Sequence, residues 1–519
     1  MTAKTLMIQG TASSVGKSIM VAALCRILKQ DGYRVAPFKA QNMALNSFVT
    51  KDGGEIGRAQ AVQAEAAGIE PAVEMNPVLL KPQADATSQI IVMGKAQSVS
   101  DAADYYRDSH KLLPIIADSL TKLRNQYDVV IIEGAGSPAE VNLMDREIVN
   151  MRIAEMAKAP VILVGDIDRG GVFASIVGTL QLLPRRQRNR IKGLVINKFR
   201  GDISLLKPGI DFLENHCRRP VLGVVPYIRN LAVAQEDSVY LDERNSYMRQ
   251  GYPDVCIIRL PHIANYDDFD PLETLCNVRY AASVEKLGDP DLIILPGTKS
   301  TISDLLFLQQ TGLSSRIIQK AEAGTPVFGM CGGYQMLGRK ILDPVNAESD
   351  VAEADGLGLL DMDTIFDSQK ITSQVRAKVE AGTGLLAGMK GMDIAGYEIH
   401  MGRCSKQSSN TLFTVTASGG TPAGYQEGGI NQTGMVFGSY IHGLFNNAEF
   451  TQRMIKNLCS LRNLPLPEGT ALDREKAYDD IASVFRQSLN MARVYKIIFT
   501  KALKLPFMVG SIGIIYGRK

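Results

Sequence analysis

The chain has 519 residues with a formal net charge of +3, and 45% of its residues are apolar. This length exceeds what a single hydrophobic core organises, so the sequence predicts two or three domains. Acidic and basic residues are interspersed, which argues against a nucleic-acid-binding protein, because such proteins concentrate basic residues on one face. Seven dispersed cysteines and the absence of a charged-then-apolar leader predict a reduced, cytoplasmic protein without a cysteine zinc site.

A phosphate-binding loop is the first motif along the chain. The apolar run Leu6–Gln9 predicts a buried strand, and it is followed by Gly10-Thr-Ala-Ser-Ser-Val-Gly-Lys-Ser18 and a helical pattern. Backbone N–H groups of such a loop wrap phosphates, the lysine reaches the terminal phosphates and the hydroxyl binds Mg²⁺. The predicted ATP contacts are Gly10, Thr11, Val15, Gly16, Lys17 and Ser18, and Ser18 is also a predicted Mg²⁺ ligand. Five residues between the glycines, in place of four, resemble the dethiobiotin-synthetase-like branch of P-loop proteins. A chance Gly-Lys-Ser at a helix start is the alternative.

Two polar segments come next, Pro37–Ser47 and Asp52–Gln60. Their apolar runs are too short for a core, so one interpretation is exposed loops. The clustered amides and cations also fit a surface that binds amides and carboxylates. Candidate substrate contacts in these segments are Lys39, Gln41, Asn42, Asn46 and Arg58. Glu55 is a further candidate Mg²⁺ ligand, and a helix N-terminal acid is the alternative interpretation.

Two later strands end in polar residues. The apolar run from Asp128 ends at Glu133 with two glycines close behind, which predicts a second Mg²⁺ ligand at the carboxyl edge of a sheet. The run from Ile191 ends in Asn197 and Lys198, which resembles the base-reading motif of related P-loop proteins. Asn197 is therefore expected to hydrogen-bond adenine.

The fold class follows from the alternation of strand and helix patterns, which predicts an α/β doubly wound parallel sheet. The predicted strands lie near Leu6, Val35, Ile90, Val129, Val161, Leu194 and Val221. We expect a P-loop ATP-dependent domain over 1–235, a second α/β domain over 252–450, a helical segment over 451–495 and a basic, apolar tail over 496–519. A polar linker is expected from about 234 to 253. The tail is too short in its apolar run to span a bilayer.

A cysteine elbow marks the second domain. The apolar strand before Cys331 ends in Gly-Met-Cys-Gly-Gly, and a helical pattern follows. A sharp strand-to-helix turn exposes a thiol at the positive end of a helix, where the thiolate is favoured. A buried structural cysteine is the alternative. Of the five histidines, His442 is the preferred base, because an apolar strand delivers it to a glycine.

These residues resemble the class I glutamine amidotransferase family, which uses a Gly-x-Cys-x-Gly elbow and a histidine late in the domain. The resemblance implies that Cys331 attacks the glutamine side-chain amide, forms a thioester and releases ammonia. The family usually places a glutamate two residues after the histidine, and this chain has Leu444 there. Either the site is a dyad or another carboxylate substitutes, with Glu398 as a candidate.

Longer motifs resemble the cobyric acid synthase family of corrinoid-amidating enzymes. They are Gln41–Ser47, Gly54–Gln60 and Leu295–Ser300. The resemblance implies ATP- and glutamine-dependent amidation of the b, d, e and g carboxylates of adenosylcobyrinic acid a,c-diamide, with Mg²⁺ as the metal. Two alternatives stay open. One is a related amidoligase such as cobyrinic acid a,c-diamide synthase, and the other is a P-loop positioning ATPase with a degenerate glutaminase-like domain. Ala12 stands where that ATPase class usually has a signature lysine.

Overall fold

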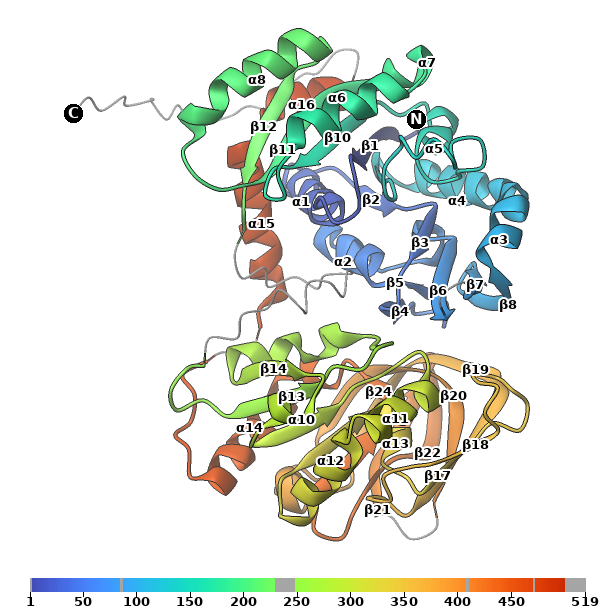
Figure 1. Ribbon diagram of the computed structural model, residues 1–519, viewed down its shortest axis with the longest axis vertical. Helices are drawn as coiled ribbons and strands as arrows, with labels where there is room; N and C mark the ends of the chain where they lie inside the picture. Colours follow the sequence, from blue (N-terminus) through green and yellow to red (C-terminus); the bar gives the residue numbers. More distant parts are fainter. Residues whose placement is uncertain (1, 85–86, 229–247, 407–409, 470–471, 500–519) are drawn as a thin grey trace, which may run out of the picture.

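The computed structural model describes residues 2–84, 87–228, 248–406, 410–469 and 472–499. Figure 1 shows two lobes, one formed by the N-terminal half together with the last helices and the other by the segment between them. Most of the predicted linker, and the predicted tail beyond 499, lie outside the described residues.

The first lobe is built on a parallel sheet of six strands in the order β12-β11-β10-β1-β9-β2. Alternate residues of the central strand enter two different cores. Leu6 and Ile8 pack with the helix that follows the phosphate loop, whereas Met7 packs in the core on the other face. The predicted doubly wound sheet is therefore confirmed. Its strands are β1 (Lys4–Gly10), β2 (Val35–Phe38), β9 (Val129–Glu133), β10 (Val161–Asp166), β11 (Ile191–Phe199) and β12 (Val221–Pro226). The helices of this part are α1 (Lys17–Gln30), α2 (Arg58–Ala67), α3 (Ala102–Asp108), α4 (Leu113–Gln126), α5 (Met151–Met156), α6 (Val172–Leu182), α7 (Arg185–Arg188) and α8 (Ile203–Cys217).

The strand predicted near Ile90 exists but does not belong to the parallel sheet, so that part of the prediction is wrong. It is β7 (Thr87–Val92), which pairs antiparallel with β6 (Val78–Ala84) and β8 (Lys95–Asp101). β3 (Gln41–Met43) completes this separate sheet. A short β-ribbon, β4 (Ser47–Val49) with β5 (Glu55–Gly57), leads into α2.

The helical segment after residue 450 divides between the two lobes. α14 (Ala448–Arg462) packs in the second lobe. α15 (Arg474–Ser488) and α16 (Met491–Ile498) return to the first lobe, where their apolar residues join the core beside α1 (Figure 1). Helices from early and late in the described chain therefore build the same lobe.

The second lobe contains a mixed sheet of twelve strands. Its parallel part runs β14-β13-β15-β16-β23, and β22, β21 and β19 continue it antiparallel. The parallel strands are β13 (Asp254–Ile258), β14 (Asn277–Ala281), β15 (Leu292–Leu295), β16 (Val327–Met330) and β23 (Val436–Ser439). The others are β17 (Lys340–Leu342), β18 (Glu353–Asp355), β19 (Met362–Val379), β20 (Asp393–Lys406), β21 (Asn410–Ser418), β22 (Thr421–Ile430) and β24 (Ile441–His442). The helices are η3 (Tyr266–Thr274), α10 (Val284–Leu287), α11 (Thr301–Gln310), α12 (Leu313–Glu322), α13 (Gly332–Met336) and α14. Within the described residues, no helix combines the length and apolar character needed to cross a membrane.

Candidate active sites

The phosphate loop joins β1 to α1 at the carboxyl edge of the parallel sheet. Lys17 folds back over the loop, where its ammonium donates to the carbonyl oxygens of Ala12 at 2.9 Å and Gly136 at 3.1 Å. Gly16 caps α1 in the left-handed region at a φ of 95°, where a β-carbon would lie 2.2 Å from the Asn197 amide. The predicted strand, glycine loop and helix thus occur in the required order.

Asn197 lies behind this loop at the end of β11. Its side-chain nitrogen donates to the carbonyl oxygen of Val15 at 2.8 Å. Next to it, Lys198 forms an ion pair with Asp166 at 2.9 Å. Asn197 therefore fixes the loop backbone, and its predicted contact with adenine stays a prediction.

A buried carboxylate stands beside the loop. The Ser18 hydroxyl donates to Glu133 Oε1 at 2.8 Å, and the Lys39 ammonium contacts the same oxygen at 2.9 Å. Gln63 donates to the other oxygen at 2.5 Å. Burial opposes ionisation of Glu133, but the Lys39 charge and these hydrogen bonds hold its pKa below the usual range. A hydroxyl and an ionised carboxylate at this distance fit the oxygen ligands that Mg²⁺ prefers.

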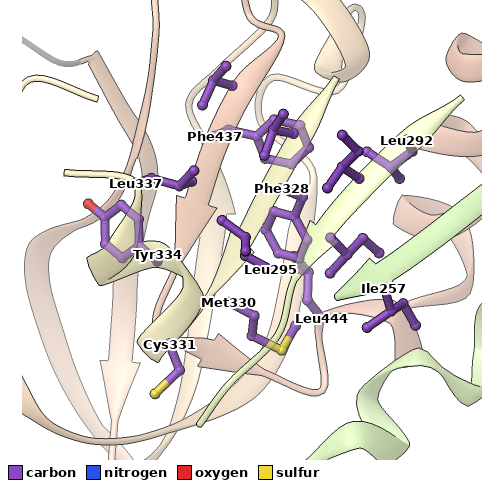
Figure 2. Packing of buried hydrophobic residues seen from close by; sticks show 14 of the residues in the cluster. Ile257, Leu292, Leu295, Phe328, Met330, Cys331, Tyr334, Leu337, Phe437 and Leu444 are labelled. Atoms are coloured by element: carbon purple, nitrogen blue, oxygen red, sulfur yellow. The ribbon is translucent and has the colours of Figure 1, made fainter. Parts of the chain in front are cut away.

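In the second lobe, Cys331 occupies a sharp turn between β16 and α13. Its φ of 51° and ψ of −109° are unusual for a residue with a side chain. The turn requires glycine behind it, because a β-carbon on Gly333 would lie 2.0 Å from the carbonyl oxygen of Leu295. Figure 2 shows Cys331 at the edge of the apolar cluster, with its sulfur directed away from Phe328 and Leu295. The predicted nucleophile elbow is present.

His442 ends β24 and faces the thiol. Its Nδ1 lies 2.6 Å from Asp268 Oδ2, and the other oxygen of Asp268 accepts from the Gly443 N–H at 2.7 Å. Tyr397 stacks on the imidazole with ring centroids 5.3 Å apart. Burial alone would lower the pKa of His442, but the Asp268 charge and the neighbouring Cys331 raise it to about 10. The arrangement is a thiol, an imidazolium and an orienting carboxylate.

The carboxylate that orients His442 is not the one predicted. Glu398 pairs in register with Ile441 and its side chain accepts from the Tyr425 hydroxyl, so the Glu398 prediction is wrong. Leu444, two residues after the histidine, is fully buried and packs in the core of the lobe (Figure 2). Asp268 supplies the missing carboxylate from η3, so the dyad alternative is also excluded.

A cavity of about 60 Å³ adjoins the thiol and has charged walls. Lys299, Glu348 and Lys370 of the second lobe line it together with Lys81 of the first lobe. Burial lowers the pKa of Lys299 and Lys370 and raises that of Glu348. The cavity is therefore completed by a residue from the nucleotide-binding lobe.

Glu55 belongs to this interdomain region. One carboxylate oxygen contacts Lys81 at 2.8 Å and the other contacts Lys370 at 2.5 Å. Although burial raises its pKa, the two lysines hold it well below the usual range. Glu55 is thus an interdomain ion-pair partner rather than the predicted Mg²⁺ ligand.

The other predicted substrate residues are buried rather than exposed. The Gln41 side chain accepts from the Tyr105 hydroxyl, and Asn42 donates to Gln60 at 2.9 Å. Asn46 and Arg58 contact the second lobe, through Asn265 and Asp267 respectively. Lys39 lies at the phosphate loop. Corrinoid binding by Lys39, Gln41, Asn42 and Asn46 stays a prediction. Arg58 is instead buried against Glu65 and Asp267, so the structure makes it a contact between the lobes and not the predicted corrinoid contact.

Sequence reasoning missed Asp268, Asp267, Asn265 and Gln63. The first three lie in Asn265-Tyr-Asp-Asp268, an acidic loop after β13 that carried no family motif. Consecutive acids in a loop are ordinary surface features, and only the fold brings them to His442. Gln63 lies on α2 three residues beyond the polar segment, and helical spacing from Gln60 is its only signal.

The fold and the two sites define a P-loop nucleotide-binding enzyme joined to a triad glutamine amidotransferase domain. Residues 6–239 match the CobQ/CobB/MinD/ParA nucleotide binding domain, and residues 254–450 match the CobB/CobQ-like glutamine amidotransferase domain. A cobyric acid synthase of Dehalococcoides mccartyi strain CBDB1 is 55% identical over 497 residues, covering 96% of this chain and 99% of that protein. A cobyric acid synthase of Caldanaerobacter subterraneus subsp. tengcongensis is 49% identical, covering 95% and 98%. The chain belongs to the cobyric acid synthase family.

Proposed function

We propose that the protein is a glutamine-hydrolysing cobyric acid synthase that amidates the b, d, e and g carboxylates of adenosylcobyrinic acid a,c-diamide in cobalamin biosynthesis. Its substrates are the corrinoid, ATP and glutamine. The observation that carries the proposal is the Cys331–His442–Asp268 triad beside a cavity that Lys81 of the nucleotide-binding lobe also lines. Nitrogen release and carboxylate activation then occur in one molecule.

Glutamine hydrolysis starts with the Cys331 thiolate, which the His442 imidazolium stabilises. The sulfur attacks the side-chain amide carbon, and His442 gives its proton to the departing nitrogen, so that ammonia leaves and a glutamyl thioester remains. Water then hydrolyses the thioester to glutamate. Asp268 keeps the imidazole oriented and charged during these steps.

Carboxylate activation takes place at the phosphate loop. A corrinoid carboxylate oxygen attacks the γ-phosphorus of ATP, the bond to ADP breaks and an acyl phosphate forms. Lys17 neutralises charge on the phosphates, and Ser18 and Glu133 would hold Mg²⁺, which supplies further positive charge when bound. Ammonia attacks the acyl carbon and phosphate leaves. Lysines outnumber carboxylates in the lining of the thiol cavity, where Lys81, Lys299 and Lys370 lie beside Glu348. This lining disfavours ammonium and so supports transfer of neutral ammonia inside the protein.

The test is to incubate the enzyme with ATP, Mg²⁺, glutamine and each corrinoid acid, and to follow amidation by mass spectrometry. We expect successive amidations of the a,c-diamide up to the fully amidated b, d, e and g product. Two amidations of cobyrinic acid itself would instead indicate an a,c-diamide synthase. ATP hydrolysis stimulated by lipid or DNA without glutamate release would indicate the positioning ATPase. The cytoplasmic location remains part of the proposal, in keeping with seven free cysteines.

A further inference from the structure

The residues that surround His442 in the glutaminase site contact the nucleotide-binding lobe. Three second-lobe residues that surround His442 each contact the segment 46–58, which comprises the β4–β5 ribbon and the start of α2. They are Asn265, whose side-chain nitrogen lies 3.5 Å from His442 Nδ1, Asp267, next to Asp268, and Tyr397, stacked on the imidazole. The residues that touch the segment 46–58 are therefore the same residues that surround the His442 imidazole.

These three contacts are specific and buried. Asn265 forms two hydrogen bonds with this segment: its N–H donates to Asn46 Oδ1 at 2.7 Å, and its Oδ1 accepts from the Ser47 N–H at 2.9 Å. The Tyr397 hydroxyl donates to the Ser47 carbonyl oxygen at 3.3 Å. Arg58 Nε lies 2.8 Å from Asp267 Oδ2, and both side chains are only 4% exposed. Removing one partner of a buried charge pair leaves the other charge without compensation, so the Arg58–Asp267 pair favours contact between the two lobes.

Arg58 is also the first residue of α2, and this helix reaches the other active site. Gln63, less than two turns further along α2, donates to the Glu133 carboxylate at 2.5 Å and to the Ser18 carbonyl oxygen at 3.4 Å. One rigid helix thus contacts the Asp267–Asp268 loop at its start and the phosphate-loop carboxylate further along. A displacement of Glu133 or Ser18 would therefore reach, through α2, the loop that carries Asp268 and orients His442.

We propose that Arg58 is a positioning residue of the glutaminase, and that α2 with the segment 46–58 couples occupation of the nucleotide site to the position of His442. This inference rests on the proposed function. In the coupled state, glutamine is hydrolysed fastest when ATP and the corrinoid are bound, so ammonia is made when an acyl phosphate can receive it. Arg58 acts through Asp267 and touches neither glutamine nor nucleotide phosphate in this role.

The test uses Arg58→Met and Arg58→Lys in the full-length enzyme. Glutamate release is measured as kcat and KM for glutamine, with and without ATP and the corrinoid, and synthesis is measured in parallel with ammonium chloride. For Arg58→Met we expect stimulation by ATP and corrinoid to fall about tenfold, mainly in kcat, while ammonium-driven synthesis stays within about twofold of wild type. Arg58→Lys restores part of the stimulation, because it keeps the charge without the planar fork.

Arg474→Gln is the matched control. Arg474 pairs with the same Glu65 that Arg58 approaches, but forms no ion pair with Asp267 within the described residues, and its variant keeps the stimulation.

Unchanged stimulation in Arg58→Met overturns the inference, and so does an equal loss of ammonium-driven synthesis, which would mark a general structural or substrate-binding role. If Arg58→Met does not fold, the stimulation of glutamate release by ATP and the corrinoid is measured in Tyr397→Phe. This variant removes only the hydroxyl that contacts Ser47. Reduced stimulation then supports the coupling and wild-type stimulation refutes it. Failure of the proposed function is distinct, since the wild-type enzyme itself would then release no glutamate and amidate no corrinoid.

Discussion

Replacing Asp268 by asparagine tests directly whether Asp268 is the carboxylate that orients and charges His442. His442 is 2% exposed, and its pKa rises from 6.5 to about 10 against the opposing effect of burial. That rise corresponds to roughly 5 kcal/mol of preference for the imidazolium, to which Asp268 contributes by charge and hydrogen bond and Cys331 more weakly. Asp268→Asn removes the charge and lets the new amide donate to Nδ1, which reverses the tautomer. We expect glutamine-dependent turnover to fall about 10²- to 10⁴-fold.

The assay compares glutamine-driven with ammonium-driven amidation. Ammonium-driven synthesis should be retained in Asp268→Asn, because the acyl phosphate forms at the phosphate loop. Glu398→Gln is the matched control, since Glu398 lies on β20 near His442 in the sheet but contacts Tyr425. Asp268 does not orient His442 if Asp268→Asn keeps more than about half of the glutaminase rate, or if Glu398→Gln loses as much activity.

The His442–Asp268 pair should also make stability and glutaminase activity depend on pH. Because the folded-state pKa of His442 is raised, the pair stabilises the fold fully below about 6.5, and this contribution is lost as pH rises through about 10. The melting-temperature gap between wild type and Asp268→Asn should therefore be widest in mild acid and narrow toward pH 10. In the variant, burial without the anion pushes the histidine pKa down, so the alkaline limb of glutaminase activity should move to lower pH.

Further predictions concern the two half-reactions and the elbow. Cys331→Ala should abolish glutamine-driven synthesis and keep synthesis from ammonium salts, whereas Lys17→Ala should abolish both and spare basal glutamate release, as measured by paired assays. Glu133→Gln should stop ATP turnover while glutamine hydrolysis continues, and unchanged ATP turnover would remove Glu133 from the ligand set. Gly333→Ala places a β-carbon 2.0 Å from a backbone oxygen and should destabilise the second lobe by about 3 kcal/mol or more in denaturant unfolding. Gly178→Ala, with open space inside α6, should stabilise its helix by about 0.5 kcal/mol, and a loss there would refute the packing argument.

The sequence predicts the features that are encoded within a few residues. The phosphate loop and the Cys331 elbow each need glycines at fixed offsets between a strand and a helix, and both appear where expected. An apolar strand also delivers His442 as predicted. Local backbone constraints of this kind are readable because steric rules act on neighbouring residues.

Contacts between residues that lie far apart in the sequence could not be predicted from local motifs. Asp268 lies 174 residues before the histidine that it orients, and nothing near either residue specifies that contact. Likewise, β7 has the apolar pattern of a sheet strand, yet that pattern does not say which sheet it joins. Buried charges such as Glu55 and Arg58 looked like surface residues, because their partners are supplied by the other lobe.

The position of the third triad member has a functional consequence. A carboxylate two residues after His442 would be fixed by the same local segment, and the histidine would be oriented whether or not the lobes were in contact. Leu444 fills that position and packs in the core, so orientation passes to Asp268 in η3. The residue beside it, Asp267, is the one that Arg58 of the nucleotide-binding lobe holds. Moving the carboxylate from the histidine's own segment to this loop therefore makes an intact triad depend on the contact between the lobes, and glutamine hydrolysis becomes sensitive to the lobe that consumes its ammonia.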